Sequence, residues 1–417
     1  MSAMSLNLNN VNGDDVSPLY SGIKSEYLPF VSVNTIYYNN NPYHLAKYVK
    51  SNINRDNVLS TGLFRSVISR NGKILSFAPP KSMDTHNFIQ TYDVKECDVE
   101  EFVEGTMINA FYDADHVNYD CSEKGSWVIA TKSNIGAKNS FFTTGHIQSE
   151  DTFQHMFWDA CKSAKLNLNA LPKEYQYSFV LQHPRNRIVL DVKEPTLYVV
   201  GVNQIGENNV VGRISDREMF ANTGVKFPKV FADKYNDLKE IEREWENVNG
   251  ENKHDYREMG LVVVHRNTGN RTKFRNPHYE YVKVLRGNQP KLEFRFIELW
   301  QEKRVQEYLT YFPECKETFD AYWTKLSKFM DATFNNYVAC YMLKRQALKE
   351  YPFEYRTHMF DLHTLYKEQL KGQNKVVTIP VAVEYFRTIP AAKIMFALNY
   401  NMRPKEVESS ASASASA

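Results

Sequence analysis

The chain has 417 residues, a length that predicts two or three domains. Its 51 lysines and arginines nearly balance its 49 aspartates and glutamates, and the formal charge of +2 excludes a strongly basic coating protein while allowing a local basic groove. Hydrophobic residues at 42% are enough for a sizeable core in a globular protein.

The cysteines and the apolar runs predict a compartment and exclude a membrane partner. No two of the five cysteines lie closer than Cys97 and Cys121, a spacing that is not typical of a disulfide framework or a CxxC metal site. The polar start of the chain lacks the apolar core of a signal peptide, and the strongest apolar stretch, 196–202, is far shorter than the ~20 residues that span a bilayer. We therefore expect a protein of the reducing cytoplasm.

The first two thirds of the chain read as strands with two interspersed helices. Residues 1–18 are polar and are expected to be disordered. Asn71-Gly72 predicts a hairpin between strands at 64–68 and 74–77. Further β-rich runs lie at 106–112, 126–131, 177–181, 187–190, 196–202 and 260–265. Apolar stripes predict helices after Asp151 and over 238–248, the second stopped by Gly250.

The apolar period changes near residue 295. A helical repeat of aromatic and aliphatic residues runs over 319–341, and shorter helices are predicted at 358–370, at 381–387 and from Pro390. We therefore predict an α+β domain over 19–294, with antiparallel sheets flanked by helices. A smaller all-helical domain should follow over 295–405, and a Ser/Ala tail over 406–417 should be disordered.

Several short motifs follow one another in the first domain. In chain order they are TGLF at 61–64, SFAPPKSM at 76–83, EFVEGTMIN at 101–109, ATKSNIG at 130–136, SFVLQHPRNRIV at 178–189, EMGLVV at 258–263 and TKFRNPHY at 272–279. In order and spacing they resemble the nucleotidyltransferase motifs of phage-type single-strand RNA ligases, which depend on ATP and end in a helical domain. The resemblance implies a nucleotidyltransferase fold, ATP and Mg²⁺ as cofactors, and RNA or a nucleotide as partner, with no membrane.

The resemblance also implies a set of site residues. Lys81, Glu104, Gly105, Lys132, Arg187, Lys273 and Arg275 fall on positions that would bind a nucleotide or RNA. Three positions that carry charged residues in the family carry uncharged residues in this chain. Phe102 stands where the nucleophilic lysine belongs, Met259 stands at the metal-side glutamate, and Thr61 stands at an early arginine. Glu258 is one residue away from that glutamate and should point to the opposite face of a strand.

The chemistry of individual residues leads to further expectations. Lys273 and Arg275 alternate with Arg271 and should share one strand face, either a solvated edge or a phosphate-binding face. We predict that Lys273 and Arg275 project into the same cleft as Lys132 and Glu104. The turn at 183–187 is either a plain hairpin turn or an RNA-contacting loop. Glu104 is a possible metal ligand, and the spacing of His358, Asp361 and His363 does not favour a metal site.

Three functions stay open on this evidence. The first is a nucleotidyltransferase-fold protein that binds a nucleotide or RNA end and is defective in lysine–AMP chemistry, since phenylalanine offers no nucleophile. The second is an active ATP-dependent RNA ligase, for RNA repair or end joining, that uses a non-standard lysine, Lys81 or Lys132. The third is a structural or interaction module that no longer binds nucleotides. The sequence therefore does not decide whether the chain is an enzyme.

Overall fold

The computed structural model describes residues 5–7, 29–118, 124–141, 152–206, 209–245 and 254–402. The chain divides into two compact units, Met1–Arg286 and Gly287–Ala417. Most of the predicted disordered ends, together with Asp151, Val248 and Gly250, lies outside the described residues. Within the predicted N-terminal disordered segment, Ser5–Asn7 forms a short strand, β1, that pairs with a later strand of the first unit.

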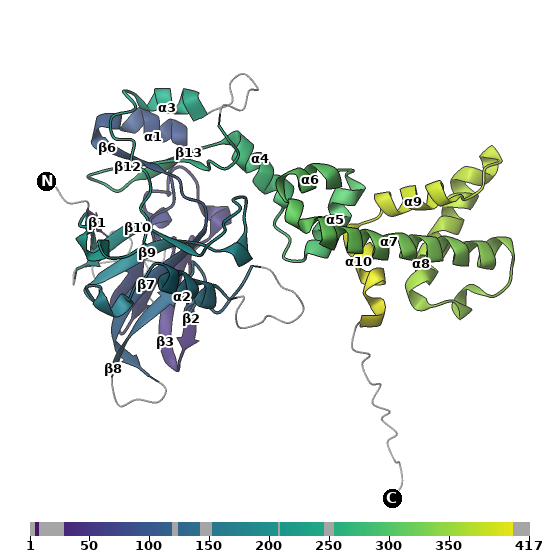
Figure 1. The fold of residues 1–417 in the computed structure, drawn as a ribbon, viewed down its shortest axis with the longest axis horizontal. Coiled ribbons are helices and arrows are strands. Elements are labelled where there is room, and N and C mark those ends of the chain that lie inside the picture. Colours follow the sequence, from purple (N-terminus) through teal and green to yellow (C-terminus); the bar gives the residue numbers. More distant parts are fainter. Residues whose placement is uncertain are drawn as a thin grey trace, which may run out of the picture. The chain divides into compact units, whose positions relative to one another are not determined.

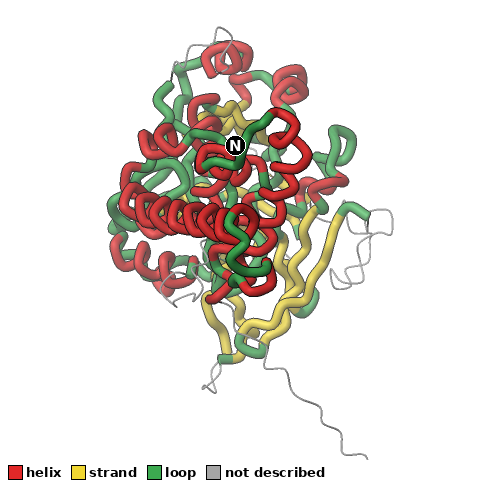
Figure 2. Tube along the Cα trace, turned by 90° about the vertical axis from the view of Figure 1, so that its right-hand side faces the viewer, coloured by secondary structure: helices red, strands yellow, loops and turns green. Residues whose placement is uncertain are grey.

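In its described residues, the first unit contains three antiparallel sheets and four α-helices (Figures 1 and 2). The six-stranded sheet has the order β1, β11 (Val210–Arg213), β10 (Thr196–Ile205), β9 (Tyr175–Gln182), β7 (Thr106–Val117) and β8 (Lys124–Ala130). The four-stranded sheet contains β2 (Val31–Tyr38), β3 (Asn41–Tyr48), β4 (Val67–Arg70) and β5 (Lys73–Phe77), and the three-stranded sheet has the order β13 (Arg271–Arg275), β12 (Gly260–His265) and β6 (Cys97–Glu101). The helices are α1 (Thr85–Thr91), α2 (Phe153–Ser163), α3 (Leu238–Trp245) and α4 (Pro277–Arg286).

The predicted hairpin at Asn71-Gly72 is present between β4 and β5. Both turn residues have positive φ, 50° and 76°, as a two-residue hairpin with the natural strand twist requires. The first strand begins at Val67 rather than at residue 64, because Thr61–Leu63 forms a 3₁₀ turn in which the Thr61 hydroxyl donates to the Asn57 carbonyl.

Alternation of side chains divides the three-stranded sheet into two different faces. Leu261, Val263 and Phe274 are buried on one face, where they join a core with Phe88 of α1 and Ile241 of α3. Figure 1 shows α1 and α3 on this same side of β6, β12 and β13. The other face carries the alternate residues of each strand and is lined by charged groups. Because Leu261, Val263 and Phe274 pack against α1 and α3, the alternate side chains of the same strands must lie on the opposite, charged face of the sheet.

The predicted strand at 187–190 is wrong. After β9 the chain forms a 3₁₀ turn at Pro184–Asn186, which His183 caps by accepting from the Arg185 amide. The backbone N–H groups of Val189 and Leu190 then donate to the carboxylate of Glu104, at 3.1–3.3 Å. A side chain supplies the hydrogen bonds that a neighbouring strand would otherwise provide, so the β-rich composition of this run does not produce a ladder.

The predicted helix after residue 151 packs on the six-stranded sheet. Thr152 caps α2 by accepting from the His155 amide. Phe157 of α2 is fully buried against Phe179 of β9, with ring centroids 5.7 Å apart. This core holds β9 and β7 in register at the point where β7 begins.

Within its described residues, 287–402, the second unit contains helices and no strand. Its α-helices are α5 (Leu292–Gln301), α6 (Val305–Tyr311), α7 (Lys316–Tyr337), α8 (Phe353–Leu365), α9 (Ile379–Thr388) and α10 (Ala391–Leu398). The predicted long aromatic run forms α7 and continues as a π-helical turn, Val338–Met342. Along the described part of the chain, no helix is long and apolar enough to cross a membrane.

Candidate functional site

The charged face of the three-stranded sheet brings together residues from three distant parts of the chain. On β13, Lys273 pairs with Val262 of β12, which in turn pairs with Glu100 of β6. Phe102 directly follows β6, and its amide donates to the Gly260 carbonyl at 2.9 Å. Side chains on this face line a cavity of about 320 Å³, which we call the cationic cavity.

Positive charge dominates this cavity. Arg271, Lys273 and Arg275 of β13 all line it, which confirms that the three share a strand face. Arg65 enters from the turn before β4, and Lys283 enters from α4. Arg275 pairs with Glu280 at 2.9 Å and is half exposed. The prediction of a solvent-exposed strand face therefore fits only Arg275 among these three residues.

Three basic side chains of the cavity, Arg65, Arg271 and Lys273, form no ion pair with a carboxylate among the described residues, although Glu100 partly offsets the charge of Arg271. Arg65 makes one long hydrogen bond to the Pro79 carbonyl, and the Nε atom of Arg271 is buried without a hydrogen-bond partner. Burial, aided by Arg271 and Arg65, lowers the pKa of Lys273 to about 5. Burial also lowers the pKa of Arg271 to about 9 and that of Arg65 below its usual value. An anion in the cavity would relieve this desolvation and mutual repulsion.

Phe102 forms part of the wall and contacts the lysine. The Nζ atom of Lys273 lies 3.9 Å from the centroid of the Phe102 ring, and the guanidinium carbon of Arg275 lies 6.0 Å from it. The position that the resemblance assigns to a nucleophile therefore holds an apolar ring that contacts a neighbouring amine.

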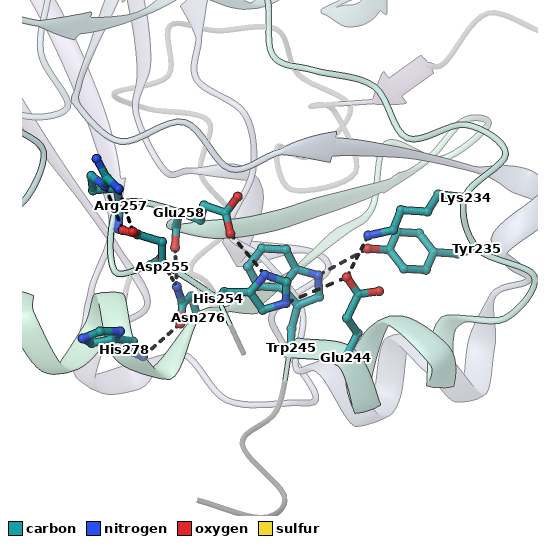
Figure 3. A network of polar contacts seen from close by, with 10 residues as sticks. All are labelled: Lys234, Tyr235, Glu244, Trp245, His254, Asp255, Arg257, Glu258, Asn276 and His278. Carbon is teal, nitrogen blue, oxygen red and sulfur yellow. Dashed lines mark hydrogen bonds and ion pairs between the residues drawn. The ribbon is translucent and has the colours of Figure 1, made fainter. Parts of the chain in front are cut away.

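Met259 lines the same cavity, and the segment before it belongs to a polar network that Figure 3 shows around Asn276 and Glu258. The Asn276 amide nitrogen donates to the Asp255 and Glu258 carbonyls, and the Asn276 backbone amide donates to the Met259 carbonyl at 3.2 Å. The carboxylate of Glu258 points away from the cavity to His254, which stacks on Trp245. Glu258 is thus no substitute for a carboxylate at Met259, although strand alternation is not the reason, because both residues precede β12.

Glu104 is a buried structural anchor beside the cavity. Glu104 is only 4% exposed. It lines neither the cationic cavity nor a second, neighbouring cavity. Its carboxylate holds the 189–190 backbone and interacts with Tyr279, and burial raises its pKa. The predicted sharing of a cleft with Lys273 is therefore not observed for Glu104.

Gly105 lets the chain pass close to β9. Its φ is +148°, and a Cβ atom here would lie 2.5 Å from the Leu181 carbonyl oxygen. No L-residue fits this space without displacing β9, so a packing requirement explains the glycine. Gly105 also lines the cationic cavity.

A second cavity of about 720 Å³ adjoins the first and is lined by Lys81 and Lys132. Arg65, Lys273 and Arg275 line both cavities. The Nζ atom of Lys132 lies 4.6 Å from the ring centroid of Tyr48. Lys132 thus lines a cleft together with Lys273 and Arg275, although about 140 residues separate it from them in sequence.

Arg187 lies apart from these groups. It lines neither cavity, and its Nε atom donates to the Val189 carbonyl. Arg185 of the same turn pairs with Asp159 of α2 at 2.8 Å. This turn is tied to its own neighbourhood rather than to the cationic cavity.

The charged residues do not make a metal site. The described residues contain no group of three His, Cys, Asp or Glu side chains suited to a metal ion. Glu100 in the cavity pairs with Arg213, and Glu104 is occupied by backbone amides. In the second unit His358 contacts Tyr385, whereas Asp361 pairs with Lys393. Among the described residues, no set of three such side chains would hold Mg²⁺ by itself.

Several charged cavity residues were missed from the sequence, among them Arg65, Arg213 and Lys283. Arg65 is the single charge in the otherwise buried run 61–69, a pattern that could have indicated a cation facing an internal cavity. Lys283 lies on the helix that follows β13 and has no comparable signal. Thr61, at the position of an early arginine, is fully buried and bonded to Asn57, so Arg65 supplies the nearby charge.

Comparison with known proteins gives a partial likeness. No family model matches the chain. A 109-residue segment is 27% identical to an RNA ligase of Rhodothermus phage RM378, over 25% of this chain and 22% of that protein, so the chain matches about a fifth of the relative's length. A solved archaeal ATP-dependent RNA ligase aligns at 10% identity over 70% of this chain and 68% of its own, with a TM-score of 0.35. In one quarter of its sequence, the chain is thus similar to an RNA ligase.

Proposed function

We propose that this chain is an RNA-ligase-like protein that binds the phosphate of a nucleotide or of an RNA end in the cationic cavity, without standard lysine–AMP chemistry. The observation that carries the proposal is the set of three desolvated basic side chains, Arg65, Arg271 and Lys273, none of which forms an ion pair with a carboxylate among the described residues. Charge-assisted hydrogen bonds to phosphate oxygens are the contacts such side chains make best.

The apolar part of the wall suits the rest of a nucleotide. Pro79, Val180, Val200 and Met107 also line the cavity and could contact a base or sugar. ATP is the nucleotide that the resemblance implies. Since no three described carboxylate, histidine or cysteine side chains would hold Mg²⁺ by themselves, a divalent cation would bind together with the nucleotide, whose phosphates the basic side chains would help to neutralise.

The absence of a nucleophile at the expected position argues against standard catalysis. Phe102 cannot attack a phosphorus atom, and Met259 cannot support a metal. The alternative nucleophiles, Lys81 and Lys132, line the second cavity, whereas Phe102 lines the first. We therefore favour binding over ligation.

Titration of the full chain with ATP, AMP and pyrophosphate tests the proposal. Replacing Lys273 and Arg275 together with alanine should weaken binding by about 1–3 kcal/mol and make its salt dependence shallower. The matched control is the pair Lys193→Ala and Arg257→Ala, because both residues are exposed and pair with nearby aspartates. Equal binding by the two double variants would contradict the proposal, and absence of salt-sensitive binding in the parent chain would favour a purely structural module.

Incubation with labelled ATP and Mg²⁺ separates binding from ligase chemistry. We expect no covalent protein–nucleotide adduct. An adduct that disappears in Lys81→Ala or Lys132→Ala would instead establish an active enzyme with a non-standard lysine.

A further inference from the structure

We propose that the outer edge of β2 is a docking surface for a second copy of this chain, with the two β2 strands paired antiparallel about a two-fold axis at Thr35. The inference is independent of the proposed function, because no residue of β2 lines the cationic cavity or the second cavity.

The first argument is that this edge is unpaired in the described part of the chain. β2 is the end strand of the four-stranded sheet, and among the described residues it pairs only with β3 (Figure 1). Both edges of the three-stranded sheet are covered by contrast. The Met83 amide donates to the Arg271 carbonyl of β13, and the Glu101 amide of β6 donates to the Lys229 carbonyl, each at 2.8 Å.

The hairpin between β2 and β3 determines which backbone groups point outward. Its turn residues, Asn39 and Asn40, have positive φ, 47° and 61°, so a two-residue turn joins the strands and the pair that flanks it exchanges hydrogen bonds. Counting back from that pair, the N–H and C=O groups of Val33, Thr35 and Tyr37 point away from β3. Thr35 is exposed and Tyr37 is 73% exposed, so a second strand could reach these groups.

The second argument is that β2 lacks the features that protect an edge strand. Its sequence, VSVNTIYY, contains no charged residue and no proline, and its register with β3 has no bulge. Edge strands of monomeric proteins usually carry such features, because an unprotected edge pairs with other chains. Four of the eight residues are β-branched and two are aromatic, a composition that favours extended pairing.

The third argument identifies the occupant, because β2 is complementary to its own copy. Only odd-numbered residues present backbone groups outward, so odd residues must face odd residues in an antiparallel pair. With Thr35 opposite its own copy, Val33 lies opposite Tyr37 on both sides of the axis. Thr–Thr pairs and pairs of a β-branched with an aromatic residue stabilise antiparallel sheets. An uncharged strand also meets its copy without repulsion and offers no charge to attract an acidic or basic peptide.

Sedimentation of the full chain from about 1 to 200 µM tests the inference. The average mass should rise from 48.5 kDa towards twice that value, with a Kd of about 1–100 µM, since a single strand pair makes a small interface. Hydrogen exchange at the Val33, Thr35 and Tyr37 amides should slow as the concentration rises. The even-numbered amides of β2, which already bond to β3, should show no such change.

Opposite charges at Thr35 test the two-fold axis. Thr35→Lys and Thr35→Glu each place two like charges opposite one another, so each variant should dimerise at least about tenfold more weakly than the parent. An equimolar mixture of the two variants should recover the dimer as a Lys–Glu pair, a recovery that misfolded chains cannot give. Thr324→Lys is the matched control, because Thr324 is also exposed but lies on α7, and it should dimerise like the parent.

Two kinds of result would overturn the inference. The first is a parent chain that stays monomeric at about 200 µM. Outward amides protected at every concentration would then show that another segment of the same chain covers the edge. The second is a dimer that survives both Thr35 variants, or one that the mixture does not recover, because a different surface or register would then join the copies.

Discussion

Replacing Lys273 with methionine should make the free protein more stable while weakening its binding of phosphate. Burial and the neighbouring cations lower the pKa of this lysine from 10.5 to about 5, so it is neutral at pH 7 in the folded chain and charged in the unfolded chain. Deprotonating it at pH 7 costs roughly 1.4 kcal/mol for each of about 3.5 pH units, or at most about 5 kcal/mol. Because Lys273 is only half-buried, the actual cost is smaller, and we expect Lys273→Met to raise the free energy of unfolding at pH 7 by about 2 kcal/mol.

The pH dependence of this difference has a defined sign. Above the unfolded pKa of 10.5 the lysine is neutral in both states and costs nothing. As the pH falls from 10.5 to about 5, only the unfolded chain gains the proton, so the wild type loses stability relative to Lys273→Met. The advantage of the variant should therefore be largest near pH 5–6 and shrink as the pH approaches 10.

Thermal and urea unfolding of both full-length chains at several pH values measures this advantage. A gain of about 2 kcal/mol should appear at pH 7 as an increase of several degrees in Tm. Lys283→Met is the control, because Lys283 also lines the cavity but lies 3.6 Å from Glu280, and its replacement should change stability by less than about 0.5 kcal/mol. A Lys273→Met variant that is less stable than the wild type at pH 7, or whose advantage does not change with pH, would refute the reasoning.

Four further measurements test other parts of the molecule. Binding of pyrophosphate at pH 7 should take up close to one proton, because the bound anion restores the charge of Lys273, and calorimetry in buffers of different ionisation enthalpy counts it. Glu104→Gln should cost about 1–3 kcal/mol in urea unfolding, since one carboxylate oxygen facing the Val189 and Leu190 amides becomes a donor, whereas the exposed Glu258→Gln should cost little. Gly105→Ala should destabilise the first unit by at least about 1 kcal/mol, because its Cβ would meet the Leu181 carbonyl, and a normal Tm would show that β9 can move away. Burial lowers the pKa of His358 to about 4, so the stability of the second unit should decline as the pH falls from 6.5 to 4, and His358→Asn should flatten this dependence in a circular-dichroism pH series.

The sequence alone determined the elements whose signals are local. The Asn71-Gly72 turn requires positive φ at two successive residues, and the structure has it there. The alternation of Arg271, Lys273 and Arg275 places three cations on one face because strand side chains have a period of two. The long aromatic repeat likewise predicted α7, since helical spacing is a property of the residues themselves.

Only the tertiary structure decided which of these residues meet. The run at 187–190 has strand composition, but the buried Glu104 carboxylate takes its amide hydrogens, a contact between residues about 85 positions apart. Glu104 was expected in the cleft and is instead used inside the core, whereas Arg65 enters the cavity with only its isolated charge to indicate it. Cross-strand pairing of β6, β12 and β13 brings Phe102 to Lys273, and this register depends on which faces α1 and α3 bury. Burial and strand pairing between distant residues therefore place the cations of β13 in a cavity, and no local sequence pattern predicts these contacts.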